Sequence, residues 1–558
     1  MVRTESPPIN VRRPEALPRL WPWLLLPLVV SAWTREWWAP DEPRYAEVAR
    51  EIARSGNWLV MHLCGEVYPN KPPLSFWLSS LCGELFGWSE LSLRLPVLLA
   101  TAASAWLIER LARRWFGETE ALLAPAIYLS SAMVLWHGAR LQIDPLLGAL
   151  TLGALVLATE TARDASSRAR LVIAAGACTG LALLAKGPVA LIFVGLPLLL
   201  WRRVDGRPEV PASRAATGAA IALSLLPGLA WAGAVTLRHP EIGYDLFVGQ
   251  FFERALAGRN HVSPFWYHAG VQPLLLLPWT LPVLAGAVLG WRALRERRAG
   301  RPFDVGSARV FLWAWPLFLL FSASPEKRDL YLLPAYPAFA LAGARWLATA
   351  RLETASRKWI AASGPALLAL AGLAVCFAPF VRERLPQELV DVSWQPAAVG
   401  IALIVGSALA GRFALRGRAT DGALASAAGL GLAAAVAALA IFPRVNALKS
   451  PRHMAGYVQE LGLAPRSIPC FGVMPEGFRF YSDLPFVPTP RGKREGTSAP
   501  HEAEFVARER DASGPFLALV AHSDWSRWSE ATRAAVHVLY SDVVSGKHVL
   551  LVGDSPHP

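Results

Sequence analysis

Charged residues and cysteines are both scarce in this sequence. Only 17% of its 558 residues are Asp, Glu, Lys or Arg, whereas soluble proteins carry about 25%. A chain so poor in charge is not disordered, and five scattered cysteines without a CxxC spacing exclude a disulfide scaffold and a cysteine metal site. No Gly-rich phosphate loop, HExxH or GxSxG motif occurs. The shortage of charge also argues against nucleic acid as a partner, despite a net charge of +13.

Apolar residues take the place of the missing charge. They make up 54% of the chain, and the mean hydropathy is +0.34. Because roughly 20 apolar residues are enough to span a bilayer, the sequence predicts an α-helical polytopic membrane protein with about 13 transmembrane helices. The predicted spans begin near residues 20, 91, 121, 143, 171, 188, 215, 271, 310, 330, 359, 394 and 422.

The positions of Lys and Arg predict the topology of these spans. With the N-terminus in the cytoplasm, the segments that alternate on the inside carry 26 Lys and Arg, against 15 in the outside loops between spans. The N-terminal segment is predicted to be an uncleaved signal-anchor. The odd number of spans then places the C-terminus outside. Two domains follow, a transmembrane domain over 1–442, whose first outside loop covers about 34–92, and an outside domain over 443–558.

The tail differs from the rest of the chain in composition. Short apolar runs at 516–521 and 548–553 alternate with charged and Pro/Gly-rich segments, which predicts strands of a small α/β domain. The segment 489–504 has the composition of a solvated, mobile loop. The tail sequence contains no catalytic constellation, so the chemistry is expected in another part of the chain.

The first outside loop contains a polar cluster at membrane level. Residues 43–54 have a helical period, with Tyr45 and Ile52 on one face and Gly56 as a C-cap, and they predict an interfacial amphipathic helix. A second interfacial helix is predicted after the Pro-Pro pair at 72–73. Asp41 and Glu42 precede the first helix. N-capping is the simplest role for such acids, but polar groups at membrane level are costly and tend to be functional.

Several motifs of this loop and of later segments form one recognisable series. The series covers about the first 340 residues in order, and its members are DEPRYAEVAREIARSGNW (41–58), GEVYPNKPPLSFWL (65–78), RLQIDP (140–145), LLAKGPVAL (183–191), PFWYHAG (264–270), PWT (278–280) and SPEKRDLYLLPAYP (324–337). The series resembles the bacterial lipid-linked glycosyltransferases related to protein O-mannosyltransferases (glycosyltransferase family 39-like), and above all the lipid A aminoarabinose transferases.

This resemblance implies a fold and an activity. It implies a GT-C fold in the bacterial plasma (inner) membrane, with a polyprenyl (undecaprenyl) phosphate sugar held in a membrane groove. The enzyme would transfer that sugar to an extracytoplasmic acceptor, which is lipid A, another glycan or a protein. Two other interpretations stay open, a transporter or flippase of a lipid-linked sugar and a non-catalytic glycan-binding scaffold.

The resemblance also assigns residues to the reaction. Asp41 matches the catalytic carboxylate of the first loop, which Glu42 would assist unless its role is structural. Asp144 matches a second carboxylate, with an N-cap before Pro145 as its alternative. If the acceptor is a hydroxyl, Asp41 serves as general base; if it is a phosphate, Asp41 orients the acceptor.

A second group of residues is assigned to the lipid phosphate and its cavity. Lys71 matches a phosphate-binding lysine, with interfacial snorkelling as its alternative, and Arg254 matches another phosphate-binding cation. Lys186 interrupts an apolar run at an outer turn, which favours a site role. Lys327 is either a phosphate ligand or a loop cation. The remaining members are tyrosines and an arginine expected around the same cavity, namely Arg44, Tyr45, Tyr68 and Tyr331.

One departure from the family concerns a metal ion. Aminoarabinose transferases commonly have Glu before the loop lysine, and a His upstream of the second cation. This sequence has Asn70 and Phe251 at those positions. The exchange argues against a divalent metal at that place, and it leaves aminoarabinose as the sugar in doubt.

Overall fold

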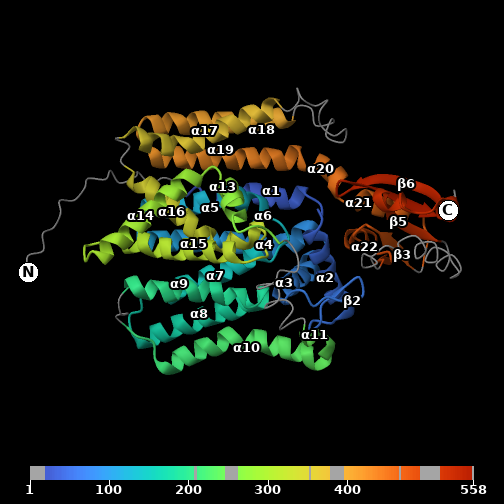
Figure 1. Ribbon diagram of the computed structural model, residues 1–558, viewed down its shortest axis with the longest axis horizontal. Coiled ribbons are helices and arrows are strands. Elements are labelled where there is room, and N and C mark those ends of the chain that lie inside the picture. Colours follow the sequence, from blue (N-terminus) through green and yellow to red (C-terminus); the bar gives the residue numbers. More distant parts are fainter. Residues whose placement is uncertain are drawn as a thin grey trace, which may run out of the picture.

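A computed structural model describes residues 19–205, 210–244, 262–350, 354–377, 395–463, 465, 467–489 and 516–555. Long helices run side by side in a bundle, and a small sheet lies at one end of it (Figure 1). The architecture is therefore the predicted one, a helical membrane domain with a small α/β domain at the C-terminus.

The helices of the bundle follow the predicted spans. Within the described residues, seven are long and apolar enough to cross a membrane, namely α4 (Glu90–Trp115), α8 (Ala165–Lys186), α10 (Arg214–Arg238), α15 (Val305–Ala323), α17 (Ala355–Phe377), α18 (Gln395–Leu415) and α19 (Ala419–Ala440). An eighth candidate is a pair bent by 115°, α13 (Tyr267–Leu275) and α14 (Thr280–Arg298).

The other predicted spans coincide with shorter helices. These are α1 (Leu26–Thr34) with the preceding η1 (Trp23–Leu25), α5 (Glu118–Ser130), α7 (Asp144–Ala158), α9 (Val189–Asp205), and α16 (Tyr336–Thr349) with the preceding η3 (Asp329–Ala335). Each predicted span thus has a helix, but the number that crosses the bilayer stays a prediction.

Small residues bring the helices of the bundle close together. A Cβ atom at Gly406 of α18 would lie 2.6 Å from the Cα of Gly429 in α19, and one at Gly286 of α14 would lie 2.1 Å from the carbonyl oxygen of Ala342 in α16. Larger side chains at these glycines would force the helices apart. Close backbone approach of this kind is how membrane helices gain packing energy without a hydrophobic driving force.

The first loop folds into two helices and a hairpin. Helix α2 (Asp41–Ser55) ends at Gly56, whose φ of +64° suits the predicted C-cap. Strands β1 (His62–Leu63) and β2 (Glu66–Val67) pair antiparallel, and α3 (Leu74–Phe86) begins directly after the two prolines, as predicted. Helix α2 begins two residues earlier than predicted. Asp41 and Glu42 therefore form its first turn, and neither side chain caps it.

The C-terminal domain is built around a five-stranded mixed sheet with the order β4-β3-β5-β7-β6. The predicted apolar runs are its central strands β5 (Leu517–Ala521) and β7 (Lys547–Gly553), which pair antiparallel. The other strands are β3 (Ile468–Phe471), β4 (Phe486–Pro488) and β6 (His537–Val544). Of the predicted loop 489–504, only Thr489 lies within the described residues.

The C-terminal domain packs on the first loop. Asn446 of α20 (Phe442–Lys449) accepts hydrogen bonds from the backbone N–H of Glu36 and from Trp38 Nε1. Arg479 of α22 (Glu476–Ser482) forms an ion pair with Glu47 of α2 at 2.9 Å. The first loop and the tail therefore lie at the same end of the bundle (Figure 1), which agrees with the topology that places both outside.

Candidate active site

The candidate site lies at the end of the bundle that faces the C-terminal domain. Polar side chains from four segments meet there: the first turn of α2, the stretch 137–144 before and at the start of α7, the last residue of α8, and the loop 324–331 between α15 and α16. These segments contain residues of four of the seven motifs in the series.

Glu42 is the buried centre of the cluster. Its side chain is 0% exposed and forms ion pairs with Arg94 at 2.9 Å and with Arg35 and Arg140 at 3.6 Å. It also accepts the backbone N–H of Leu141 at 2.9 Å. Burial by itself would raise the pKa of Glu42, but the three guanidinium groups lower that pKa to about 2. Glu42 is therefore ionised and locks the start of α2 to α4 and to the segment before α7.

Asp41 lies next to this centre and is buried, with 11% of its side chain exposed. Its Oδ2 accepts a hydrogen bond from Nη2 of Arg328 at 2.6 Å. Burial opposes ionisation of Asp41, but Arg328, with smaller contributions from Arg44 and Arg140, holds its pKa below the ordinary value. The carboxyl group is thus ionised at neutral pH, and it pairs with the loop between α15 and α16 instead of capping its own helix.

Asp144 and Lys186 form a second acid–base pair. Asp144 is the first residue of α7 and Lys186 the last of α8, and their side chains are hydrogen-bonded to each other. The N-cap alternative for Asp144 is not observed, because the cap position is Ile143. Lys186 Nζ also lies 4.7 Å from the centre of the Tyr331 ring. Lys186 is thus held between an acid and an aromatic face.

Arg328 connects the two pairs electrostatically. Although burial lowers its pKa, the charge of Asp41 raises it well above the ordinary value, and Asp144 contributes to the increase. The series Asp41, Arg328, Asp144 and Lys186 therefore alternates in charge across the site.

A cavity of about 700 Å³ opens beside Lys186. Its polar residues include Lys71, Lys186, Glu326 and Tyr331, and the Tyr331 hydroxyl donates to Glu326 Oε1 at 3.3 Å. The rest of its wall is mostly apolar, and the large side chains there are Leu191, Ile192, Phe193, Leu320 and Phe321. A cavity with a cationic end and an apolar body suits an amphipathic ligand.

Two predicted cavity residues lie elsewhere. Tyr45 is buried and packs edge-on against Phe76 at 5.5 Å, and this burial raises its pKa well above the ordinary value. Arg44 pairs with Glu476 of the C-terminal domain at 3.4 Å. Neither residue is among the described lining of the cavity that contains Lys71, and their role in binding substrate stays a prediction. The helical period places Tyr45 on the buried face of α2. The ion pair with Glu476 orients Arg44 toward the C-terminal domain.

Tyr68 lies close to the cavity but is almost completely covered. Its side chain is hydrogen-bonded to Asn70, which does line the cavity, and burial raises the pKa of Tyr68 to about 12. The hydroxyl is therefore protonated at any physiological pH. In this position Tyr68 supports the segment that carries Lys71.

Lys327 binds backbone instead of lining the cavity. Its Nζ donates to the carbonyl oxygens of Ser263 at 2.8 Å and Ser324 at 2.5 Å. These contacts correspond to the alternative of a loop cation. Arg254 and Phe251 lie outside the described residues.

Sequence reasoning missed four arginines of the site. Arg328 lies beside Lys327 in the SPEKRDLY motif, and Arg140 begins RLQIDP, so both motifs gave a signal for a cation. Arg35 and Arg94 lie at the outer ends of predicted spans, where no motif of the series marks them. Their participation depends on which carboxylate they meet in the folded chain.

No metal cluster is found among the residues that the structure describes. Groups of three or more His, Cys, Asp or Glu side chains close enough to share an ion are absent there. Asn70, at the position of the expected Glu ligand, lines the cavity beside Lys71.

The chain is similar in sequence to several known proteins. Residues 70–231 match a family described as "Dolichyl-phosphate-mannose-protein mannosyltransferase". Two curated relatives are both named "Undecaprenyl phosphate-alpha-4-amino-4-deoxy-L-arabinose arabinosyl transferase". The one from Edwardsiella ictaluri is 34% identical over 309 residues, and the one from Serratia proteamaculans is 30% identical over 314 residues. In both cases the match covers 54% of each chain, so it spans about half the length of these relatives.

Solved structures extend the likeness over the whole chain. The crystal structure of ArnT from Cupriavidus metallidurans bound to undecaprenyl phosphate superposes with a TM-score of 0.76 at 21% identity, and covers 96% of this chain and 97% of that one. The apo structure of the same protein gives 0.77. The resemblance to lipid-linked glycosyltransferases and the predicted GT-C fold are thereby confirmed. Both curated relatives are named as transferases, and neither is named as a transporter.

Proposed function

From this shared GT-C fold, we propose that the chain is a membrane glycosyltransferase that moves a sugar from undecaprenyl phosphate to an extracytoplasmic acceptor. The names of the curated relatives suggest 4-amino-4-deoxy-L-arabinose as the sugar. Lipid A is the acceptor we propose first, ahead of another glycan or a protein. The enzyme would work in the bacterial inner membrane, with its N-terminus in the cytoplasm and its C-terminal domain outside.

The observation that carries the proposal is the amphipathic cavity beside Lys186. Its apolar body suits a prenyl chain, and its cationic end, with Lys71 and Lys186, suits the carrier phosphate. The Tyr331 hydroxyl would donate to a phosphate oxygen after leaving Glu326. Arg254, carried over from the family pattern, would add another cation.

Transfer exchanges one bond at the anomeric carbon for another. The bond from that carbon to the phosphate oxygen breaks, its electron pair stays on the phosphate, and the acceptor oxygen forms the new bond. Lys71 and Lys186 would stabilise the charge that develops on the leaving phosphate. A hydroxyl acceptor would give its proton to Asp41, whereas a phosphate acceptor needs no base. Because Arg328 keeps the pKa of Asp41 low, Asp41 is a weak base, which favours a phosphate acceptor.

The remaining residues of the cluster would position the reacting groups. Glu42 has no exposed surface, so we propose that it fixes the first turn of α2 and does not touch substrate. Asp144 would hold the ammonium group of Lys186 in place. Tyr68 would support the segment that carries Lys71.

Transfer by the full-length protein tests this proposal. Membranes would be incubated with radiolabelled undecaprenyl-phosphate aminoarabinose and with lipid A, and the lipid, glycan and protein fractions would be counted. We expect label in lipid A with the wild type and none with Asp41→Asn. Glu66→Gln, an exchange at an exposed acid of the same loop, is the matched control and should transfer normally.

Other outcomes would change the proposal in defined ways. Label in glycan or protein would replace the acceptor, and transfer of another polyprenyl-phosphate sugar would replace the donor. Failure of every sugar with a correctly inserted protein would refute the glycosyltransferase function.

A further inference from the structure

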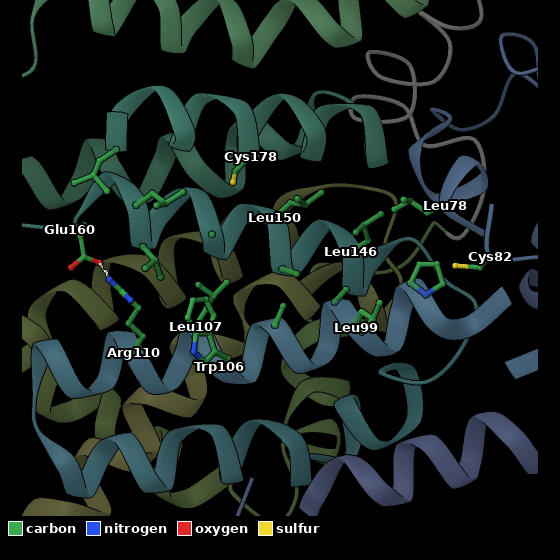
Figure 2. Close-up of a pocket in the computed structure, with 18 residues that line it drawn as sticks. Leu78, Cys82, Leu99, Trp106, Leu107, Arg110, Leu146, Leu150, Glu160 and Cys178 are labelled. Carbon is green, nitrogen blue, oxygen red and sulfur yellow. Dashed lines mark hydrogen bonds and ion pairs between the residues drawn. The ribbon is translucent and has the colours of Figure 1, made fainter. Parts of the chain in front are cut away.

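A second large cavity lies on the other side of α7 from η3, between α4, α7 and α8 (Figure 2). Its volume is about 630 Å³. Small residues on the facing helices leave this space open, Ala100 and Ala103 on α4, and Ala149 and Gly153 on α7. Because these helices belong to the membrane domain, a groove between them meets lipid and not water.

The groove is at least as long as one leaflet of a bilayer is thick. Along α4 its wall extends from Pro96 to Arg110, and along α7 from Leu146 to Leu157. The ends are 14 and 11 residues apart, so the two helices contribute about 21 and 17 Å at 1.5 Å per residue. Half of the hydrocarbon core measures about 15 Å. The groove therefore matches a single acyl chain in length.

Charge is confined to one end of the groove. Figure 2 shows Arg110 and Glu160 at that end, and Leu78 and Cys82 at the other. Glu160 pairs with both Arg110 and Arg114, at 3.1 and 3.0 Å, so two guanidinium groups share one carboxylate. The Arg110 side chain is 51% exposed.

Further arginines follow immediately along the chain. Arg163, Arg168 and Arg170 lie in the turn after α7 and in the first turns of α8, where Asp164 is used as the N-cap. This is the end predicted to face the cytoplasm. Basic pockets between membrane helices on that side attract anionic lipid head groups.

We propose that this groove binds one anionic membrane phospholipid of the inner leaflet, with an acyl chain between α4, α7 and α8 and its phosphate at Arg110. The site is distinct from the donor cavity, with which it shares no lining residue. The lipid would fill a gap that the small side chains leave and would stabilise the packing of these helices.

Native mass spectrometry of the full-length protein tests the site. The protein would be reconstituted in vesicles of phosphatidylglycerol and phosphatidylethanolamine in equal amounts, extracted, and analysed for retained lipid. Ala103→Trp would fill the groove from an exposed position, and Ala219→Trp, at an exposed alanine of α10, is its control. Arg110→Gln would remove the head-group contact. Its control is Arg418→Gln, because Arg418 is also exposed and pairs with an acid, Asp421.

We expect one retained phosphatidylglycerol on the wild type and on both control variants. Ala103→Trp should lose it, and Arg110→Gln should lower the preference for phosphatidylglycerol by about fivefold, the contribution of one arginine near an anionic surface. Retention by Ala103→Trp, an unchanged preference in Arg110→Gln, or a retained polyprenyl phosphate in place of the phospholipid would overturn the proposal. If Ala103→Trp does not fold, the Arg110→Gln arm decides.

Discussion

Arg328 donates a hydrogen bond through Nη2 to Oδ2 of Asp41 across 2.6 Å, although 287 residues separate the two in sequence. The contact joins the loop between α15 and α16 to the first turn of α2, and it keeps the carboxyl group of Asp41 ionised. Arg328 thereby controls the charge of the residue that we assign to the acceptor.

Arg328→Gln should change the pH dependence of transfer. In the wild type the pKa of Asp41 lies below its ordinary value, so the carboxylate is fully formed at neutral pH. Without Arg328, burial still raises the pKa of Asp41, but the positive charge that mainly lowers this pKa is gone. The pKa of Asp41 therefore rises. The acid limb of the rate profile should therefore move to higher pH. Transfer rates over a pH series would measure this shift.

A matched arginine makes the pH experiment specific. Arg54→Gln removes an arginine of α2 that also pairs with an acid, Asp483 at 2.5 Å, and should leave the limb in place. An acid limb that is the same in Arg328→Gln and in the wild type would show that Arg328 does not set the ionisation of Asp41.

Lys71→Met and Lys186→Met should weaken use of the lipid donor. Hydrogen bonds to charged groups contribute about 1.5–3 kcal/mol, so kcat/KM should fall by about ten- to hundredfold for each variant. Lys449→Met, at an exposed lysine of α20, is the control. Transfer assays at several donor concentrations would give kcat and KM. If kcat and KM were unchanged in both variants, the carrier phosphate would not bind in this cavity.

Glu42→Ala should destabilise the fold more than it affects any single kinetic step. It leaves Arg35, Arg94 and Arg140 buried without their carboxylate, and breaking a buried ion pair costs about 3–5 kcal/mol. Thermal unfolding of the detergent-solubilised protein would detect a lower Tm, with Glu66→Ala as the control. An unchanged Tm would show that the arginines find other partners.

The Glu42 carboxyl group also makes the stability of the fold depend on pH. The pKa of Glu42 is lowered from 4.5 to about 2 in the folded chain. Its stabilising contribution is therefore complete above 4.5 and is lost as the pH falls toward 2. Unfolding of the wild type and of Glu42→Gln should differ most near neutral pH and converge in acid.

Removal of divalent metal should leave transfer unchanged. Asn70 offers a neutral carboxamide where the family resemblance implies a Glu ligand, and neutral amides hold hard cations less well. Activity would be measured before and after treatment with a chelator, and again after adding back Mg²⁺ or Zn²⁺. A loss that a metal ion restores would contradict the prediction.

The sequence predicted much of the fold because the relevant signals are local. Hydropathy and arginine position marked the helices of the bundle, and the period of 43–54 together with Gly56 marked α2. The alternation of apolar runs in the tail marked β5 and β7. Each of these signals depends only on neighbouring residues within one helix or strand, so it can be read from the sequence alone.

The same local signals identified part of the site but could not assign every partner. Lys71, Lys186 and Tyr331 were chosen from separate motifs, and they line one cavity. Lys327 and Arg328 are adjacent cations in one motif, and nothing in the pattern distinguishes them. The loop backbone decides: Lys327 turns to two carbonyl oxygens, and Arg328 turns to Asp41.

The sequence by itself therefore determined the elements, the end of the bundle where chemistry gathers, and most of the residue types involved. Only the tertiary structure decided which charges meet. Glu42 became a buried anchor because three distant arginines converge on it, and Asp144 became the partner of Lys186 because α7 and α8 bring their ends together. Pairing of this kind is set by the distance between side chains in space, and a linear pattern contains no such distance.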